Sequence, residues 1–588
     1  MNYPVWYLPE IGGGLLIAVI AILHVFVSHF AVGGGLYLIF AEKKGLRENN
    51  AAILAFTHQH ARFFLLLTLV FGSITGVGIW FIIALINPAA TSLLIHIFVF
   101  GWAAEWVFFT VEIAAAFAFY YLFGKMDWHN HLKVGWLYFI SAWLSLFLIN
   151  GIVCFMLTPG DWLNDNTFWL GFFNPSFLPA LGFRTFAAFL LAGVYGYFSA
   201  ATGSDRAVAR TMTRFSARWA LVSLVLCIPF AFWYVAVLPG PAQGLVLGKS
   251  PTIVTALQWG GAGLVVLLVI SLVAGIWRPE LNRRPVALVA MLCALVAFGG
   301  FEWIREAARR PYAINEVLYA NMIFPGDVPR LSQDGFLRQA KWVNDRDPGA
   351  NSQAAGEELF VHQCYACHTL GGFNNDLKAQ TSAMSFAALQ SYIQRIHQVR
   401  YFMPPFVGTD EEVTALATYI AQTVHGKEIP IATHAVPGKE VDGATLFDLH
   451  CAACHDTAEI KAAVAGMEPV EVVEILATLE TISEEMTPFA GSSDQAAALA
   501  GYLTDQALSP SPPSTGEAGP LLFEKNCSIC HAPGDIPELF SGYDQLAQIR
   551  DALGRLDELS AEMQPFAGSD TEKDQLATYL FQQERNGQ

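Results

Sequence analysis

The stretch at residues 359–368, LFVHQCYACH, decides how the second half of this chain folds. It recurs as LFDLHCAACH at 446–455 and as LFEKNCSICH at 522–531, each time with a Phe four residues before the first Cys. Each copy ends in Cys-x-x-Cys-His, in which two thiols attach one haem covalently and the adjacent His becomes an axial ligand of its iron. Three copies with the same flanks predict three covalent haem c groups.

A methionine follows each motif and is the expected sixth ligand. It is followed within two residues by Pro, stands 35, 31 and 32 residues after the His, and precedes a Tyr by 16 residues in all three copies. This repeat excludes a plain thiol redox site, and His with Met is the axial pair of small electron-transfer cytochromes c. The predicted attachment residues are Cys364, Cys367, Cys451, Cys454, Cys527 and Cys530, and the predicted axial pairs are His368 with Met403, His455 with Met486, and His531 with Met563.

Charge divides the chain into two unlike parts. Residues 1–350 carry a net charge of +5, and residues 351–588 carry a net charge of −22. An acidic, haem-bearing part excludes nucleic acid as a partner, and it predicts docking of a basic periplasmic electron-transfer protein that salt would weaken.

The first part contains long apolar runs, and a bilayer is crossed by about 20 such residues. The predicted fold class is therefore all-α, with a polytopic membrane bundle of about eight spans followed by three small class I-like cytochrome c domains. The predicted spans are 11–40, 52–86, 91–123, 133–158, 177–200, 216–238, 252–276 and 285–305. The predicted domains are a membrane domain at 1–320, a connector at 321–351, cytochrome domains at 352–430, 437–507 and 519–588, and a Pro/Ser-rich linker at 508–518.

The loops between these spans alternate in charge. Lys and Arg cluster after spans one, three, five and seven, and the other loops are nearly free of them. The positive-inside rule then puts both chain ends outside. Bacteria attach haem to Cys-x-x-Cys-His on the outer face of the inner membrane, which agrees. We expect a multi-pass protein of the bacterial inner membrane whose N-terminus and cytochrome domains lie in the periplasm.

Ionisable residues inside spans are costly and usually functional. Glu105 and Glu112 stand seven residues apart on one helix face, which suits a proton path or, alternatively, hydrogen bonds to neighbouring helices. Arg184 lies about 10 Å into its span, where it can pair with a haem propionate or a glutamate. His24 and His29 are about 140° apart around their helix, so they do not readily serve one iron.

The membrane part resembles subunit I of the cytochrome bd-type quinol oxidases over about residues 10–320. The resemblance is carried by His24 in LHVFVSHFAVGG, by GSITG at 72–76, by EWVFFTVEIAAAFAF at 105–119, and by EAARRPY at 306–312, which matches Glu-x-Gly-Arg-Gln-Pro-Trp. It implies that His24 and Glu306 ligate membrane haems, that Glu112 and Glu105 carry protons, and that a second membrane subunit is present.

The chain also departs from that family. Arg184 and Trp259 stand where the family's quinol-side haem has its His and Met ligands, and only about thirteen residues join spans six and seven. We therefore expect that the quinol haem and loop are lost and that the three haem c groups replace them as the electron entry. His29 and His96 remain candidates for a further b-type haem.

These features predict an oxidoreductase that passes electrons from haem c to two or three haem b and/or d groups. It would reduce a small oxidant, oxygen by resemblance, with uptake of protons. Two alternatives remain open: a non-catalytic electron-transfer subunit of a larger respiratory complex, and a reductase of another small ligand such as nitric oxide.

Overall fold

The computed structural model divides the chain into two compact units, Met1–Ala465 with Glu471–Leu499, and Gly466–Val470 with Ala500–Gln588. Each unit is described by itself. The structure describes residues 3–349, 352–429, 442–452, 455–479, 482, 486, 489, 491–505, 519–520, 522–523, 527, 546–556, 566, 568 and 570–586.

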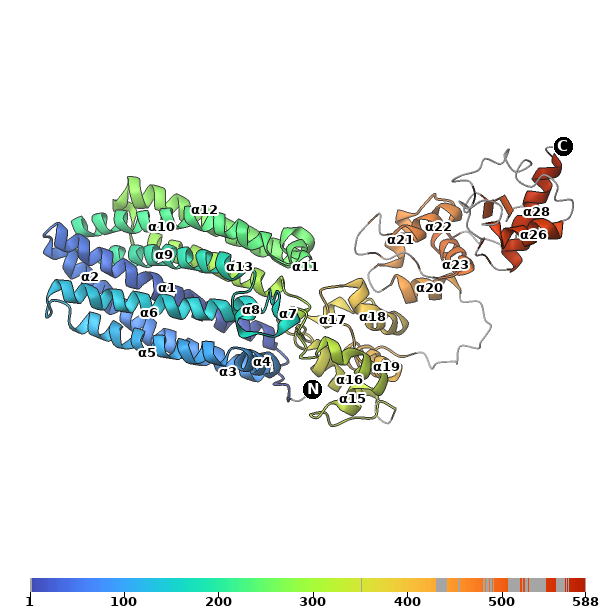
Figure 1. Ribbon diagram of the computed structural model, residues 1–588, viewed down its shortest axis with the longest axis horizontal. Coiled ribbons are helices and arrows are strands. Elements are labelled where there is room, and N and C mark those ends of the chain that lie inside the picture. The colour runs from blue at the N-terminus through green and yellow to red at the C-terminus, as the bar shows by residue number, and fades with distance from the viewer. Residues whose placement is uncertain are drawn as a thin grey trace. The chain divides into compact units, whose positions relative to one another are not determined.

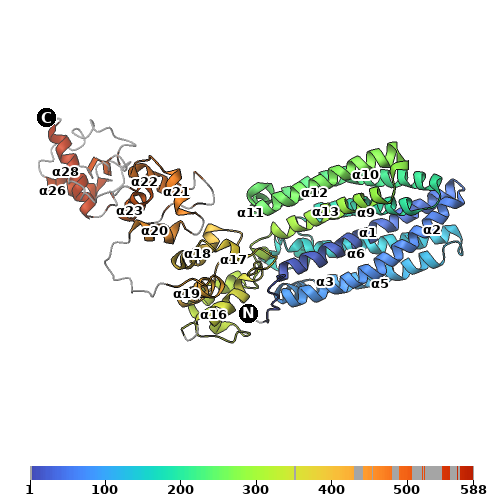
Figure 2. The ribbon, with the colours of Figure 1, turned by 180° about the vertical axis from the view of Figure 1, so that it is seen from behind.

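Eight helical segments among the described residues are long and apolar enough to cross a membrane (Figures 1 and 2). This confirms the predicted all-α class and the predicted number of spans. They are α1 (Gly13–Arg47), α2–η1–α3 (Ala51–Leu66, Leu67–Gly72, Ser73–Ile86), α5 (Val99–Tyr121), α6 (Trp128–Phe155), α9 (Phe177–Thr202), α10 (Arg206–Ala236), α12–η3 (Pro251–Ile270, Ser271–Trp277) and α13 (Arg284–Ala307).

Short elements join the spans. At the end of the bundle near the N-terminus lie α4 (Pro88–Ile97), α7 (Trp162–Asp165), α8 (Phe168–Phe172), α11 (Gly240–Gly244) and η2 (Leu245–Lys249), and η4 (Pro279–Leu281) precedes α13. At the opposite end, Asn50, Asp127 and Asp205 cap the first turns of α2, α6 and α10 through side-chain oxygens that accept backbone N–H groups. The basic loops gather at that same opposite end, because every odd-numbered span ends there.

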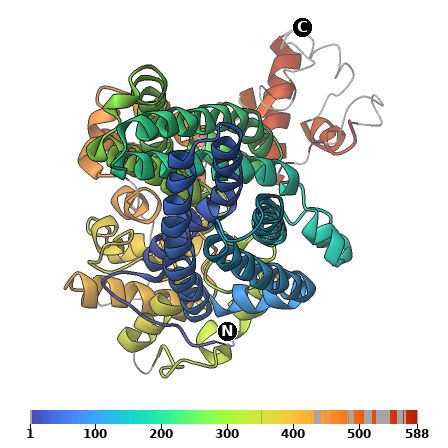
Figure 3. The same ribbon diagram turned by 90° about the vertical axis from the view of Figure 1, so that its left-hand side faces the viewer.

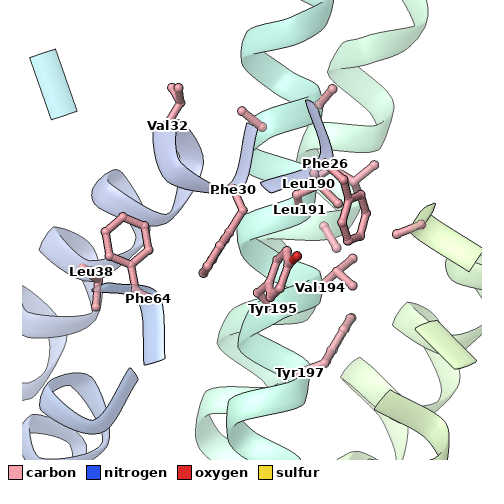
Figure 4. Close-up of a cluster of buried hydrophobic side chains, with 14 of the residues drawn as sticks. Phe26, Phe30, Val32, Leu38, Phe64, Leu190, Leu191, Val194, Tyr195 and Tyr197 are labelled. Atoms are coloured by element: carbon pink, nitrogen blue, oxygen red, sulfur yellow. The ribbon is translucent and has the colours of Figure 1, made fainter. Parts of the chain in front are cut away.

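Helix α9 is the most buried of the eight spans, with two-thirds (67%) of its most apolar stretch inside the protein, and Figure 3 shows the bundle turned by 90° from Figure 1. Small residues let its neighbours approach closely: a Cβ on Gly33 of α1 would lie 2.0 Å from the Ala188 carbonyl oxygen. Aromatic side chains fill the next layer, where Phe30 stacks on Tyr195 with ring centroids 3.8 Å apart (Figure 4). This packing fixes α1, the helix that carries His24 and His29, against α9.

The chain after α13 is folded rather than extended. It forms the hairpin β1 (Tyr312–Ile314) and β2 (Leu318–Tyr319), then η5 (Pro325–Asp327), α14 (Val328–Asp334) and α15 (Phe336–Gln339). The buried carboxylate of Glu412 accepts the backbone N–H groups of Phe336 and Leu337 at 2.9 and 2.7 Å. Most of the predicted connector is therefore part of the core of the first cytochrome module.

The first module consists of α16 (Ser352–Leu359), η6 (Phe360–Cys364), α17 (Leu377–Gln380), α18 (Phe386–Val399), α19 (Asp410–Thr418) and η7 (Tyr419–Val424). A Cβ on Gly356 would lie 2.2 Å from the Ala415 carbonyl oxygen, so only glycine permits this crossing of α16 and α19. Phe360, four residues later, is fully buried and faces Tyr419 with ring centroids 6.3 Å apart. The repeated spacing of Phe and Tyr in the sequence thus places these two side chains where two helices cross.

Of the two later modules, the described part of the third repeats this packing. In the third, Gly519 lies against Tyr579, and Phe523 faces the same ring with centroids 5.7 Å apart. Their helices are α20 (Gly443–His450), α21 (Thr457–Ala463), α22 (Pro469–Ala477), α23 (Ser493–Thr504), α26 (Leu546–Leu553) and α28 (Asp570–Asn586). The linker predicted at 508–518 lies outside the described residues.

Candidate functional site

The haem-attachment motif of the first module lies at the end of η6. His368 is buried, and its Nδ1 lies 3.1 Å from both the carbonyl oxygen and the side-chain Nδ2 of Asn375. When Nδ1 donates its proton to that carbonyl, Nε2 keeps the lone pair that an iron ligand needs. Burial raises the pKa of Cys364 to about 12, so this thiol stays protonated at neutral pH. These residues fit a covalently attached haem.

The loop that carries Met403 is tied to this motif by Gln363, the residue before Cys364. The Gln363 amide donates to the Val407 carbonyl at 2.7 Å and accepts from the Val407 N–H at 2.9 Å. The Met403 carbonyl accepts a hydrogen bond from His397 Nδ1 at 2.6 Å. The two predicted axial ligands thus come from segments that are held together directly.

Both of these segments contact the membrane bundle. The Leu8 N–H donates to the Tyr365 hydroxyl at 2.7 Å, and the Phe373 N–H donates to the Glu10 carbonyl at 2.8 Å, on the His368 side. On the Met403 side, Phe402 packs into the apolar cluster formed by the ends of α10 and α13. The first haem-binding module is therefore seated on the end of the bundle that contains the N-terminus.

A cluster of charged side chains lies at the same end of the bundle. Glu302 is buried and accepts two hydrogen bonds from Arg305, at 2.8 and 2.9 Å, and one from Arg184 Nη2 at 3.5 Å. Arg309 and Arg310 follow directly after α13. Burial lowers the pKa of Arg309 to about 10, which still leaves its guanidinium charged at neutral pH.

The cluster holds more donors than acceptors. Among the described residues, the Nε atoms of Arg184, Arg309 and Arg310 are buried and meet no hydrogen-bond acceptor. Four arginines face two glutamates, Glu302 and Glu306. Unpaired buried donors are costly, and the carboxylates of a haem propionate pair would supply the missing acceptors. The cluster fits a haem edge.

Glu306, the predicted haem ligand, lies at the surface of this cluster. Its side chain is 44% exposed and pairs with Arg310 Nη2 at 3.0 Å. The pKa of Cys367 is raised by burial, lowered by Arg310 and raised by Glu306, which puts both charges beside the first haem motif. Ligation of a membrane haem by Glu306 stays a prediction, and the buried carboxylate of Glu302 lies one turn deeper.

His24, the other predicted membrane ligand, is oriented by α3. Its Nδ1 lies 3.2 Å from the Thr75 hydroxyl, which itself donates to the carbonyl oxygens of Phe71 at 2.9 Å and Gly72 at 3.1 Å. When the hydroxyl donates its one proton to either carbonyl, it accepts from His24, which places a proton on Nδ1 and frees Nε2. A Cβ on Gly76 would lie 3.1 Å from the His24 ring. The Gly-x-x-Thr-Gly pattern thus orients the histidine and leaves room for it.

Glu105 and Glu112 both face α6. Ser145 donates to Glu105 at 2.7 Å, and the Tyr138 hydroxyl lies 3.1 Å from Glu112 and 2.9 Å from the Ala31 carbonyl, to either of which it can donate its one proton. Ser145 and Tyr138 are also seven residues apart, so the two contacts repeat along one helix pair. This geometry is compatible with both interpretations of the sequence, a proton path and hydrogen bonds between helices. The role of the two glutamates in proton transfer therefore stays a prediction.

The remaining candidates are less closely grouped. His29 is buried and its Nδ1 bonds to the Val25 carbonyl at 2.8 Å, whereas His96 is exposed on α4 and bonds to Ser92. Their joint binding of a haem stays a prediction. Trp259 is 69% exposed on α12, while Arg184 is in the core. Sequence reasoning assigned no role to Thr75, Tyr138, Ser145 or Glu302, because each acts through a contact between helices.

Parts of the second and third haem sites are described. Helix α20, which leads into Cys451, contacts α18 of the first module through Ser385 with Asp448 and through Arg395 Nη2 with the Leu449 carbonyl at 3.0 Å. In the third module the Cys527 N–H donates to the Phe523 carbonyl at 2.8 Å. His455 and Met486 are among the described residues, whereas Cys454, Cys530, His531 and Met563 lie outside them.

Comparisons with known proteins find likenesses to a cytochrome family and to one solved membrane oxidase. The family described as "Cytochrome C oxidase, cbb3-type, subunit III" matches residues 351–420, 439–503 and 514–580, one match for each haem motif. No curated protein matches the chain. The bd oxidase from Geobacillus thermodenitrificans is similar at 15% identity and a TM-score of 0.45, over 52% of this chain and 89% of that one. The protein is thus an electron-transfer membrane protein with cytochrome c domains, which implies covalent haem c.

Proposed function

We propose that this protein is a membrane-bound respiratory oxidoreductase that passes electrons from its cytochrome c modules to haem groups within the bundle. The observation that supports the proposal is the position of the first module on the bundle. Both of its axial-ligand segments contact the end of the bundle that holds the arginine cluster. The distance over which an electron passes from the first module into the bundle is therefore short.

Within the bundle, His24 and Glu306 are the proposed axial ligands, and Arg184 and Arg309 hold propionates. His29 is a candidate ligand for a further haem. When bound, two or three haem b and/or d groups supply one-electron carriers and an open coordination position for a small oxidant, oxygen by the resemblance. Full reduction of oxygen to water takes four electrons and four protons, so the protein must also move protons.

The cytochrome modules are proposed to lie in the periplasm. The N-terminal segment contacts the first module, so both are on one side, and the basic loops lie at the other end of the bundle. By the positive-inside rule that other end faces the cytoplasm. The acidic modules would receive electrons from a basic periplasmic protein. A second membrane subunit is proposed from the resemblance alone.

We expect the His24→Ala variant to lose one non-covalent haem and to keep all of its haem c. Thr75 has fixed the ring so that Nε2 is free for iron, and alanine offers no ligand. A pyridine haemochrome assay on the purified protein gives the ratio of c to b to d haem. His58→Ala, on the aromatic rings of Tyr120 and Phe123, is the control and should match wild type. Wild-type protein with haem c and no other haem would overturn the proposal.

We expect the Glu112→Gln variant to lower turnover about 100-fold with unchanged haem content, in the range of general acid–base effects. Glutamine keeps an oxygen that can accept from Tyr138, so shape and hydrogen bond survive while the exchangeable proton is lost. Oxygen consumption with a reduced donor measures the effect. Thr110→Ala, on the same helix and bonded only to the Trp106 carbonyl in the structure, is the control. Equal rates in the two variants would remove Glu112 from the proton path.

A non-catalytic electron-transfer subunit remains the second candidate. It is favoured by the short chain between α10 and α12, where α11 and η2 stand in place of the long loop that the resemblance would lead one to expect. Carbon monoxide separates the two candidates. A spectral shift of the reduced non-c haem indicates an open coordination position and an enzyme, and no shift indicates a conductor.

A further inference from the structure

A buried pair of titratable side chains lies at the end of the bundle opposite the cytochrome modules. Glu42 is in the last turns of α1 and His131 is in the first turn of α6, next to the basic loops. Their side chains are 6% and 2% exposed. Burying such a pair in an apolar bundle is costly and gives little stability, and intramembrane ionisable groups generally mark a function. Neither residue takes part in the haem sites.

The hydrogen bonds of His131 fix how many protons the pair holds. Nε2 lies 2.8 Å from the Phe119 carbonyl oxygen, which only accepts, so Nε2 carries a proton. Nδ1 lies 2.8 and 3.0 Å from the two oxygens of Glu42. A proton must lie between these groups as well, on the imidazole or on the carboxyl, since otherwise lone pairs would face each other. The pair therefore stores one exchangeable proton.

The surroundings of the pair are aromatic. The rings of Phe119 and Phe123 contact the imidazole, with centroids 4.4 and 5.1 Å away. From α2, His58 stacks on the other side of the Phe123 ring at 4.9 Å. On α6 itself, His129 and Asp127 are exposed at the loop. The stored proton thus has solvent-facing polar groups nearby on one side and an apolar wall on the other.

A small cavity lies one turn beyond His131 in the direction of Glu112. Its walls include Gly35 of α1, Ala116 and Phe119 of α5, and Gly135 and Tyr138 of α6. It has room for about one water molecule. The cavity therefore lies between Phe119, which contacts the buried pair, and Tyr138, which contacts Glu112, the first of the two intramembrane glutamates.

The groups follow one another along α6. From His131 the order is the cavity, Tyr138 with Glu112, and then Ser145 with Glu105. His131 and Ser145 are 14 residues apart, which is about 21 Å of helix in a hydrocarbon core about 30 Å thick. The order runs from the basic-loop end toward the end that carries the arginine cluster.

We propose that Glu42 and His131 form the proton-loading pair at the cytoplasmic entrance of a path to Glu112 and Glu105. The inference rests on the proposed function, in which reduction at the haems draws protons from that side. The pair takes a proton from the loop side, and releases one through the cavity water to the Tyr138–Glu112 contact. No bond other than O–H and N–H forms or breaks in these steps.

The test follows proton uptake rather than oxygen turnover. The full-length holoprotein, in detergent without buffer, is reduced rapidly while a pH indicator dye reports protons and the Soret band reports haem reduction. We expect Glu42→Gln and His131→Asn to slow proton uptake about 10-fold or more, with haem content and the first electron transfer unchanged. Glutamine can still donate to Nδ1, so the packing survives. Glu42→Asp should restore most of the rate, which a merely structural role would not explain.

The matched control is His60→Asn. His60 is also a buried histidine near the same end, bonded through Nδ1 to Ser199 at 2.6 Å, and it lies off the path. Its proton uptake should equal that of wild type. If Glu42→Gln and His131→Asn take up protons at the wild-type rate, the loading pair is wrong and the proposed function stands. If wild-type protein reduces its haems without taking up protons, both are wrong.

Discussion

Replacing Cys364 and Cys367 together by alanine should stop electrons from a protein donor reaching the membrane haems. The haem-binding segments of the first module contact the bundle, through Tyr365 on one side and Phe402 on the other. Without its haem, the chain lacks the electron carrier that lies against the bundle. Electron transfer falls steeply with distance, so we expect reduction of the non-c haems to slow by more than about 100-fold, on the order of 3 kcal/mol in the barrier.

Stopped-flow reduction by a basic cytochrome measures this effect, with c and non-c haems followed at separate wavelengths. The remaining haem c should still be reduced at the wild-type rate, and a small reductant such as dithionite should still reduce the membrane haems. The Met403→Leu variant is the control for loss of folding, because it keeps the covalent haem while changing the axial ligand and the reduction potential of that haem. Wild-type reduction of the non-c haems in the double-alanine variant would show that electrons enter the bundle elsewhere.

The features predicted correctly from the sequence are those set by residues close together in the chain. The eight spans follow from runs of apolar residues, and the repeated spacing of Phe and Tyr corresponds, in the first module, to the contact of Phe360 with Tyr419. Such patterns have a fixed period, so a single sequence reveals them. The haem-attachment motif belongs to the same class, because its residues lie within five positions.

The contacts that the sequence did not reveal join residues that are far apart in the chain. Glu42 and His131 are 89 residues apart, and Arg184 and Glu302 are 118 residues apart. The sequence around each residue does not identify its partner, and for Arg184 the sequence indicated only that a glutamate could be one. The connector gives a second example: the sequence predicted it only as a link between domains, and in the structure the Glu412 carboxylate of the first module accepts its backbone N–H groups.

Removing the carboxylate of Glu302 should destabilise the bundle strongly. Glu302 is the acceptor for Arg184 and for Arg305, and the side chains of the buried pair are only 6% and 5% exposed. In Glu302→Leu two guanidinium groups would remain in an apolar bundle without their counter-charge. Breaking a buried ion pair by removing one partner costs about 3–5 kcal/mol. We therefore expect a large fall in the denaturant midpoint of the detergent-solubilised protein.

The double variant Arg184→Leu/Glu302→Leu tells whether the loss comes from stranded charge. It removes one of the two unpaired cations, and Arg305, whose side chain is 16% exposed, can turn toward water. Its midpoint should therefore lie above that of Glu302→Leu alone. Glu280→Leu breaks a surface pair with Arg278 whose side chains are 50% and 73% exposed, and should cost less than about 1 kcal/mol. Equal midpoints for Glu302→Leu and Glu280→Leu would mean that water screens the buried charges. The arginine cluster would then be too accessible to solvent to bind a haem propionate selectively by charge.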